Sequence, residues 1–201
     1  ASVDLFERVI QIDPNFPGGF AGKSIALSMK VIFIKSDDPS RDLESAMLLA
    51  QNAIEISPEF SLGYAAMALQ HAVNGEVDSS LANIKRTLAS RPRDPGAIGV
   101  SSAALIIIDR PLQAIELLSE AIRFNPNNIR TPYLNLLGIA QYLTGDYAAA
   151  LTSFEKNLAQ GGPSGIHMDI FWAATYMQLD KNLEAQALVD RILRTDPDYP
   201  D

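Results

Sequence analysis

The residues Gly18-Gly19-Phe20-Ala21-Gly22-Lys23-Ser24 contain the groups from which a phosphate-binding loop is built. Such a loop needs a glycine, four intervening residues and then Gly-Lys-Ser, so that backbone N–H groups and the lysine surround a phosphate. Here Pro17 stands where the first glycine is required, and a helical pattern ending at Pro14 precedes it instead of a strand. We therefore interpret Lys23 and Ser24 as residues inside a helix and predict no cofactor.

Histidines and paired carboxylates offer little further chemistry. We interpret His71 as an interhelical packing residue, whereas His167 begins a helix beside a glycine-rich loop and could touch a ligand. Asp37-Asp38 and Asp196-Pro197-Asp198 lack the alternating spacing and terminal glutamate of a calcium loop, and capping explains them. No Gly-x-Ser-x-Gly or His-Glu-x-x-His motif occurs. We predict no catalytic residue, no metal site and no enzyme within this chain.

Composition excludes several classes of partner. The chain has 201 residues, a formal net charge of −8 and no cysteine. The charge opposes binding to nucleic acid, whose phosphates require a basic surface. No apolar run approaches the roughly 18–20 residues of a membrane span, so we expect no direct membrane insertion. The lack of cysteine leaves the compartment open: cytoplasmic, or periplasmic if a membrane span precedes this segment in a longer chain.

The elements that position these residues repeat at a fixed interval. Pro58, Pro92 and Pro126 are 34 residues apart, and Pro163 and Pro197 are again 34 apart. Each proline ends a similar helical phrase. A 34-residue period that ends in proline is typical of a two-helix repeat stacked into a solenoid.

One copy of the repeat is nearly complete. It contains Leu137-Gly138-Ile139-Ala140, then Gly145 to Leu151, then Phe154-Glu155-Lys156. Gly138 is small where two antiparallel helices approach, and Gly145 permits a tight left-handed turn between them. These residues resemble the tetratricopeptide repeat, and the resemblance covers nearly the whole chain.

The repeat pattern predicts an all-α fold: a right-handed α-solenoid of antiparallel helix pairs, with about five full repeats after a leading half repeat. We expect one domain over residues 1–201, cut from a longer protein, since the chain opens in the second half of a repeat. Eleven helices are predicted, at residues 2–13, 17–35, 40–57, 61–74, 78–90, 95–108, 111–124, 130–144, 147–160, 166–179 and 182–195.

Two repeats are longer than the rest. Pro14 to Pro58 spans ten residues more than one period, with the surplus around Lys30–Arg41, and Pro126 to Pro163 spans three more. The long first repeat, together with the phrase Arg130-Thr131-Pro132-Tyr133-Leu134, resembles the repeat region attached to bacterial class III adenylate or guanylate cyclases. That resemblance implies a regulatory segment whose catalytic domain lies upstream.

The tetratricopeptide resemblance implies a binding groove lined by the first helix of each repeat. Counted from the repeat start, the expected groove residues are Leu62, Ala65, Leu69, Gly99, Ala103, Ile106, Asn135, Ile139, Tyr142, Ile170, Ala174 and Met177. This surface is mostly apolar, which suits an amphipathic helix or an extended apolar peptide. The alternative for each residue is packing against a neighbouring helix, because buried and groove stripes overlap on one helix.

Three functions follow from these expectations. The first is a non-catalytic scaffold that binds a peptide or a partner domain, the second is the regulatory segment of a cyclase, and the third is a sensor of a small apolar molecule.

The leading half repeat adds a further expectation. Leu5, Phe6, Val9 and Ile10 form one stripe that lacks a partner helix, which predicts partial exposure and a homodimer formed through that stripe.

Overall fold

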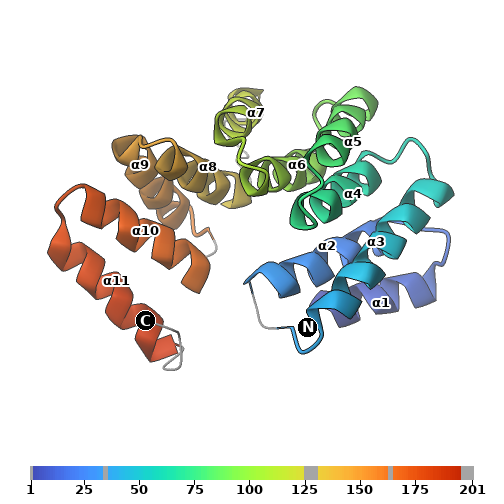
Figure 1. Cartoon of the computed structure of the whole chain (residues 1–201), viewed down its shortest axis with the longest axis horizontal. Coiled ribbons are helices and arrows are strands. Elements are labelled where there is room, and N and C mark those ends of the chain that lie inside the picture. Colours follow the sequence, from blue (N-terminus) through green and yellow to red (C-terminus); the bar gives the residue numbers. More distant parts are fainter. Residues whose placement is uncertain (1, 34–35, 125–130, 163–164, 196–201) are drawn as a thin grey trace. The chain divides into compact units, whose positions relative to one another are not determined.

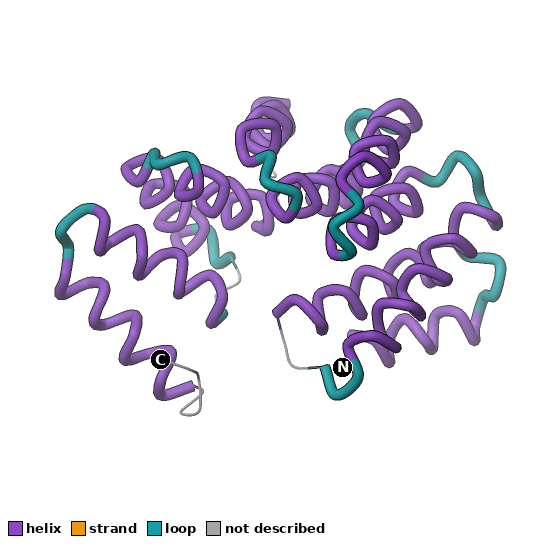
Figure 2. The backbone as a smooth tube through the Cα atoms, in the orientation of Figure 1, coloured by secondary structure: helices purple, strands orange, loops and turns teal. Residues whose placement is uncertain are grey.

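A computed structural model describes residues 2–33, 36–124, 131–162 and 165–195. Over these ranges the chain forms eleven α-helices and no strand (Figures 1 and 2). In chain order the helices are α1 (Ser2–Ile12), α2 (Pro17–Phe33), α3 (Pro39–Ile56), α4 (Ser61–Val73), α5 (Val77–Ser90), α6 (Pro95–Ile107), α7 (Pro111–Phe124), α8 (Thr131–Leu143), α9 (Tyr147–Ala159), α10 (Ile166–Gln178) and α11 (Asn182–Thr195).

The predicted all-α fold is confirmed. Each of the eleven predicted helices is present. The end predicted at residue 35 and the start predicted at residue 130 lie outside the described residues, and every other end differs from its prediction by no more than one residue. The Asp-Pro pairs that predict two of the helix starts form N-caps in the structure. The Asp38 carboxylate accepts a hydrogen bond from the Arg41 backbone N–H, at 3.1 Å, and the Asp94 carboxylate accepts one from the Gly96 backbone N–H, at 2.9 Å. In both cases proline occupies the first turn, where its missing N–H leaves no bond unmade.

Glycines make the tight turns within two of the helix pairs. Gly75, between α4 and α5, has a φ of +76°, and Gly145, between α8 and α9, has a φ of +82°. This left-handed backbone costs glycine little because it has no Cβ. The turn predicted at Gly145 is therefore confirmed.

The surplus of the first repeat is taken up largely by longer helices. α2 has 17 residues and α3 has 18, whereas α4 has 13 and α5 has 14. Lys30 near the end of α2 donates to the Asp42 carboxylate of α3, with Nζ and Oδ2 2.9 Å apart. The Ser36 hydroxyl donates to the same oxygen at 2.7 Å. These bonds fasten the two long helices where the chain passes from one to the other.

The chain forms two compact units, residues 1–110 and residues 111–201. The sequence predicted one domain, and each of the two units has its own internal packing. In the first unit α1 packs on α2, α4 packs on both α2 and α3, and α6 packs on both α4 and α5. Small side chains let the helices approach: Ala21, Ala50, Ala53 and Ala66 form a buried cluster.

Polar side chains also lie inside the first unit, and they are bonded. Gln70 of α4 donates to the hydroxyls of Ser24 and Ser28 on α2. Ser24 in turn donates to the Ala46 carbonyl of α3, at 2.7 Å. All three polar side chains are buried, so this network fixes the register of three helices without leaving these donors unpaired.

The second unit repeats the same arrangement. α7 packs on α8, α8 pairs with α9, and α10 packs on both α8 and α9 while pairing with α11. Thus, in both units, the first helix of a pair covers the two helices of the pair before it. Stacking of this kind is the organising feature of an α-solenoid.

Candidate functional site

In the first unit three of the six predicted groove residues lie in the interior. Ala65 and Leu69 on α4 are fully buried, and Ala103 on α6 is 8% exposed. Leu62, Gly99 and Ile106 are half-buried. The buried positions follow from the packing of α4, which contacts α2, α3, α5 and α6. Ala65, Leu69 and Ala103 thus pack against neighbouring helices, the alternative to groove lining, and present almost no surface to a partner in this structure.

In the second unit all six predicted residues keep accessible surface. Asn135, Ile139 and Tyr142 on α8 are half-buried, and so are Ile170 and Ala174 on α10. Met177 is 55% exposed. The structure brings the three α10 residues together on one surface, whereas Ile139 and Tyr142 pack under α10.

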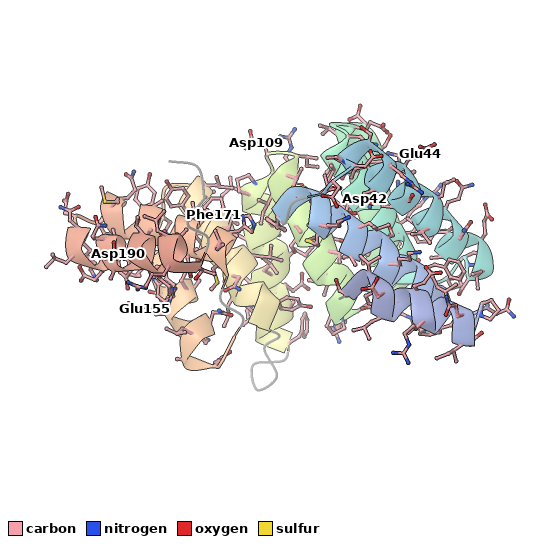
Figure 3. The ribbon with its side chains drawn as sticks, turned by 90° about the horizontal axis from the view of Figure 1, so that it is seen from below. Asp42, Glu44, Asp109, Glu155, Phe171 and Asp190 are labelled. Carbon is pink, nitrogen blue, oxygen red and sulfur yellow. The ribbon has the colours of Figure 1, made fainter. Side chains whose placement is uncertain are left out.

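Side chains on one face of α10 cover the α8–α9 pair. Trp172 stacks on Phe154 of α9 with ring centroids 6.1 Å apart, and both side chains are buried. Phe171, labelled in Figure 3, meets Tyr142 of α8 edge to face at 5.6 Å. Met168 joins the same apolar cluster. α10 therefore seals the α8–α9 pair with residues spaced i, i+3 and i+4 on one helix face.

The pair α10–α11 matches the pair α8–α9 at an offset of 35 residues, as Ala150 and Ala185 show. Met177 then corresponds to Tyr142, and Val189 to Phe154. Phe154 is fully buried, whereas Val189 is 38% exposed, because no described helix covers this pair. The face of the α10–α11 pair is therefore uncovered among the described helices, whereas α10 covers the equivalent face of the α8–α9 pair.

This open face is hollowed into an apolar groove of approximately 540 Å³ between α10 and α11. We call it the α10–α11 groove, and its lining residues are Ile170, Ala173, Ala174, Met177, Asn182, Ala185, Gln186, Val189, Ile192 and Leu193. The α10 wall contains three residues predicted from the sequence. The α11 wall was not predicted, although the apolar spacing of Val189, Ile192 and Leu193 could have indicated it.

An ion pair holds the two walls of the groove together. Arg191 of α11 donates to both carboxylate oxygens of Asp169 on α10, at 3.0 Å from Nε and 2.5 Å from a terminal nitrogen. Asp169 is almost fully buried. A two-bond guanidinium–carboxylate pair fixes direction as well as distance, so the groove is built on a rigid frame.

The other candidate residues have structural surroundings. Lys23 lies within α2 and pairs with Glu7 of α1, and His71 on α4 contacts the Glu76 carboxylate through Nδ1 at 2.6 Å. These contacts agree with the interpretation of Lys23 and His71 as structural residues. Asp38 caps α3, as described above. His167 is half-buried in the first turn of α10, while Asp196 and Asp198 lie outside the described residues.

Among the described residues, no group of three or more His, Cys, Asp or Glu side chains is placed to hold a metal ion. Within the same ranges, no helix has the length and hydropathy needed to cross a membrane.

Comparisons with known proteins support this architecture. No protein-family model matches the sequence. The chain is 26% identical over 130 residues to the cytochrome c-type biogenesis protein CycH of Rhizobium meliloti (strain 1021). That alignment covers 63% of this chain and 33% of the relative, so the chain spans about a third of the longer protein.

Similar solved structures are tetratricopeptide-repeat proteins or contain the same fold. TTC0263, a thermophilic TPR protein of Thermus thermophilus, aligns with a TM-score of 0.68 at 21% identity, over 89% of this chain and 92% of that one. The human IFIT1 dimer, solved with m7Gppp-AAAA, aligns with a TM-score of 0.72 at 19% identity, over 95% of this chain and 45% of that one. The helix-pair repeats of this protein therefore form an α-solenoid of the tetratricopeptide type. At such identities the likeness concerns the fold alone.

Proposed function

We propose that this chain is a non-catalytic scaffold that binds a segment of a partner protein in the α10–α11 groove. The observation that carries the proposal is the groove itself, which is lined by apolar and uncharged polar side chains of two helices. Exposed apolar side chains gathered over two helices are typical of an interaction surface. The groove includes Ile170, Ala174 and Met177, which the repeat pattern of the sequence predicts as groove residues.

A protein partner fits the charge of the molecule better than a nucleic acid does. The net charge of −8 would repel phosphates, and the groove itself is lined by apolar and uncharged polar side chains. The IFIT1 structure contains a capped RNA fragment, so the fold alone does not exclude such a ligand. The expectation of no nucleic-acid partner rests on the charge of the chain and on the lining of the groove.

The similarity to CycH favours a role in assembling another protein. That relative is named for cytochrome c biogenesis, a process in which one protein is matured by others. We propose, as a narrower form of the same function, that this chain holds a protein during such an assembly step. The regulatory segment of a cyclase is a different candidate, and it requires a cyclase domain upstream of this chain. The full-length sequence of the protein tests it.

A small apolar ligand remains the second candidate, because the groove volume lies in the range of ligand pockets. Such pockets enclose most of their ligand, however, and Met177 on the rim is more than half exposed. Native mass spectrometry of the purified protein tests this candidate, since a bound molecule would add a discrete mass.

Photo-crosslinking tests the scaffold function directly. A photoreactive phenylalanine placed at Met177 should crosslink a protein in the cells that produce this chain. The same group at Leu183, which is 85% exposed on α11 but outside the groove, serves as the control. The purified partner should bind the wild type and lose affinity for Met177→Glu. Identical crosslinks from both positions would contradict a function at this groove.

A further inference from the structure

We propose that the first unit has a docking surface of its own, which binds a short acidic segment of a partner protein through four basic side chains. These side chains lie at the end of α5 and in the loop before α6 (Figure 1), and we call them the basic segment: Lys85, Arg86, Arg91 and Arg93. The inference does not rest on the proposed function, because the α10–α11 groove belongs to the second unit.

The basic segment reverses the sign of the charge locally. The chain has 16 lysine and arginine residues against 24 acidic ones, and four of the 16 lie in this segment. No acidic residue occurs between Asp78 and Asp94. Without these four positive charges the net charge of −8 would be −12. An anion is therefore attracted to this segment and opposed by the charge of the rest of the chain.

These charges are accessible, and three of them are not neutralised within the chain. All four side chains are exposed. Lys85, Arg86 and Arg91 form no ion pair with any described carboxylate, whereas Lys30 and Arg191 each pair with a carboxylate of the neighbouring helix. Basic residues in the last turn of a helix often offset its dipole, but α5 has none in its last turn. The three unpaired charges are thus available to a partner.

The arginines of the loop border a hollow in the surface. The hollow has a volume of approximately 710 Å³ and is lined by Ser90, Arg91, Pro92, Arg93, Asp94 and Pro95. Asp94 opposes an anion, but both of its carboxylate oxygens are already bonded. Oδ1 accepts from the Gly96 and Ala97 backbone N–H groups, at 2.9 and 3.1 Å, and Oδ2 accepts from the Ser61 hydroxyl, at 2.7 Å. The two arginines therefore set the sign of the hollow.

An aromatic ring holds Arg86 in position. Its guanidinium lies over the Tyr64 ring of α4, 5.8 Å from the ring centroid. Arg86 and Ser90 are four residues apart on α5, so Arg86 lies on the helix face that leads to the hollow. A guanidinium stacked on a ring keeps its N–H edge open, and that edge matches the two oxygens of one carboxylate. The Asp94–Ser61 bond is a second link to α4, so little ordering is needed when a ligand binds.

The carboxylates of a peptide fit this surface better than the phosphates of a nucleic acid. Double-stranded DNA carries one charge about every 1.7 Å and would extend past four basic residues onto a chain of the same sign. Neighbouring Asp or Glu side chains of a peptide present their carboxylates over a short length, which suits one guanidinium on α5 and two in the loop. Arginine clusters are a recurrent means of recognising such acidic segments.

Binding of a fluorescein-labelled hexaglutamate peptide to the 201-residue protein tests the inference, with fluorescence anisotropy as the measurement. We expect saturable binding at low salt that weakens as salt is added, because salt screens exposed charges. Arg86→Gln combined with Arg91→Gln should weaken binding roughly tenfold or more. Arg123→Gln combined with Lys156→Gln removes the same charge from exposed positions of the second unit. This matched control should leave binding close to that of the wild type.

Arg86→Lys separates the shape of the guanidinium from its charge. Lysine keeps the charge but loses the planar fork, so this variant should weaken binding by about threefold. Unchanged binding by Arg86→Lys would overturn the role of Arg86 as a carboxylate clamp. Circular dichroism checks that each variant keeps its helices, and Arg91→Gln alone, a change in the loop, replaces the double variant if that variant loses them.

The remaining outcomes decide the nature of the occupant. Absence of saturable binding, or equal weakening by the control pair, would overturn the inference. So would displacement of the labelled peptide by a single-stranded oligonucleotide at a lower concentration than unlabelled hexaglutamate requires, because the occupant would then be a nucleic acid. Self-association at low salt that Arg86→Gln with Arg91→Gln abolishes would identify a second copy of the chain instead and also overturn it. Met177→Glu should leave hexaglutamate binding unchanged, so this inference and the proposed function can fail separately.

Discussion

Gly138 sets the distance between α8 and α9. A Cβ atom added at this position would lie 2.5 Å from Cε1 of Phe154, and Phe154 is fully buried, so its ring has no space into which it can move. We predict that Gly138→Leu lowers the free energy of unfolding by about 2–4 kcal/mol.

Urea denaturation followed by circular dichroism measures the effect of Gly138→Leu. Gly165→Leu provides the control, because a side chain at Gly165 would point into open space. That control should cost no more than about 1 kcal/mol, the usual range for a change of helix cap. An unchanged urea midpoint for Gly138→Leu would show that α8 and α9 are not in close contact at this point.

Asp42 contributes a stability that depends on pH. Its hydrogen bond from the Lys30 ammonium, and next the one from Ser36, hold the pKa of Asp42 below its ordinary value of 3.8. The stabilisation is therefore present above that value and is lost as the pH falls through the lowered pKa. The hydrogen bond to Asp42 likewise raises the pKa of Lys30 above 10.5, so the contribution of Lys30 is present below that pH and is lost as the pH rises through the raised pKa.

Asp42→Asn should accordingly lower the urea midpoint at pH 7 by roughly 0.1–0.5 M, with the difference from wild type shrinking below about pH 4. Glu44→Gln is the matched control, an exposed carboxylate on the same helix (Figure 3). A difference that stays constant from pH 7 to pH 3 would show that charge plays no part in the effect of Asp42.

At the scale of elements, the sequence predicted the helices well because their ends carry local signals. Asp38-Pro39 and Asp94-Pro95 begin helices, and Gly145 ends one, through interactions with their immediate neighbours in the chain. Burial on a particular helix face depends instead on tertiary packing. Leu69 and Met177 both fit the groove pattern, yet the first is buried among packed helices and the second is exposed.

The second wall of the groove could not be predicted from the assumption that first helices alone bind partners. Val189 belongs to a second helix, and its equivalent one repeat earlier, Phe154, is buried in the stack. Leu158, the equivalent of Leu193, is 50% exposed even though α10 covers the α8–α9 pair. Val189 is exposed here because the described structure places no helix over α10–α11. The sequence pattern contains the apolar residues, but only the packing shows which of them remain uncovered.

The leading helix α1 is the least covered element of the first unit. None of its residues is buried; Leu5 is 61% exposed and Ile12 is 81% exposed. The predicted partial exposure is therefore confirmed, although Phe6 packs on Gly22 and is half-buried. We predict that the chain self-associates weakly through α1 and that Leu5→Glu abolishes this association.

Light scattering over a range of protein concentrations measures this self-association. Leu5→Glu is a better variant than Phe6→Glu, because the Phe6 ring supports the packing of α2 and its loss would also disturb the fold. Leu183→Glu, an exposed leucine of the second unit, is the control. A strictly monomeric wild type at high concentration would remove α1 as an assembly surface.

At the scale of the whole molecule, stability in a repeat protein is a sum of the stabilities of single repeats and of the contacts between neighbours. Each unit here has its own buried residues: Ala21, Ala50 and Ala66 in the first, Phe154 and Trp172 in the second. A core defect should then loosen the repeats around it far more than distant ones. A partner bound in the α10–α11 groove would, by the same reasoning, chiefly stabilise the second unit.

This locality leads to a prediction for hydrogen exchange. Phe154→Ala removes a fully buried ring that packs on Gly138 and Trp172, and should cost about 3–5 kcal/mol in the second unit. Measured by mass spectrometry, backbone exchange should accelerate in α8, α9 and α10 and remain close to wild type in α2, α3 and α4. Leu69→Ala, at a fully buried position of the first unit, should produce the reverse pattern. If either variant accelerates exchange equally throughout the chain, the two units unfold as one cooperative body, and a partner bound at α10–α11 would then stabilise the entire molecule.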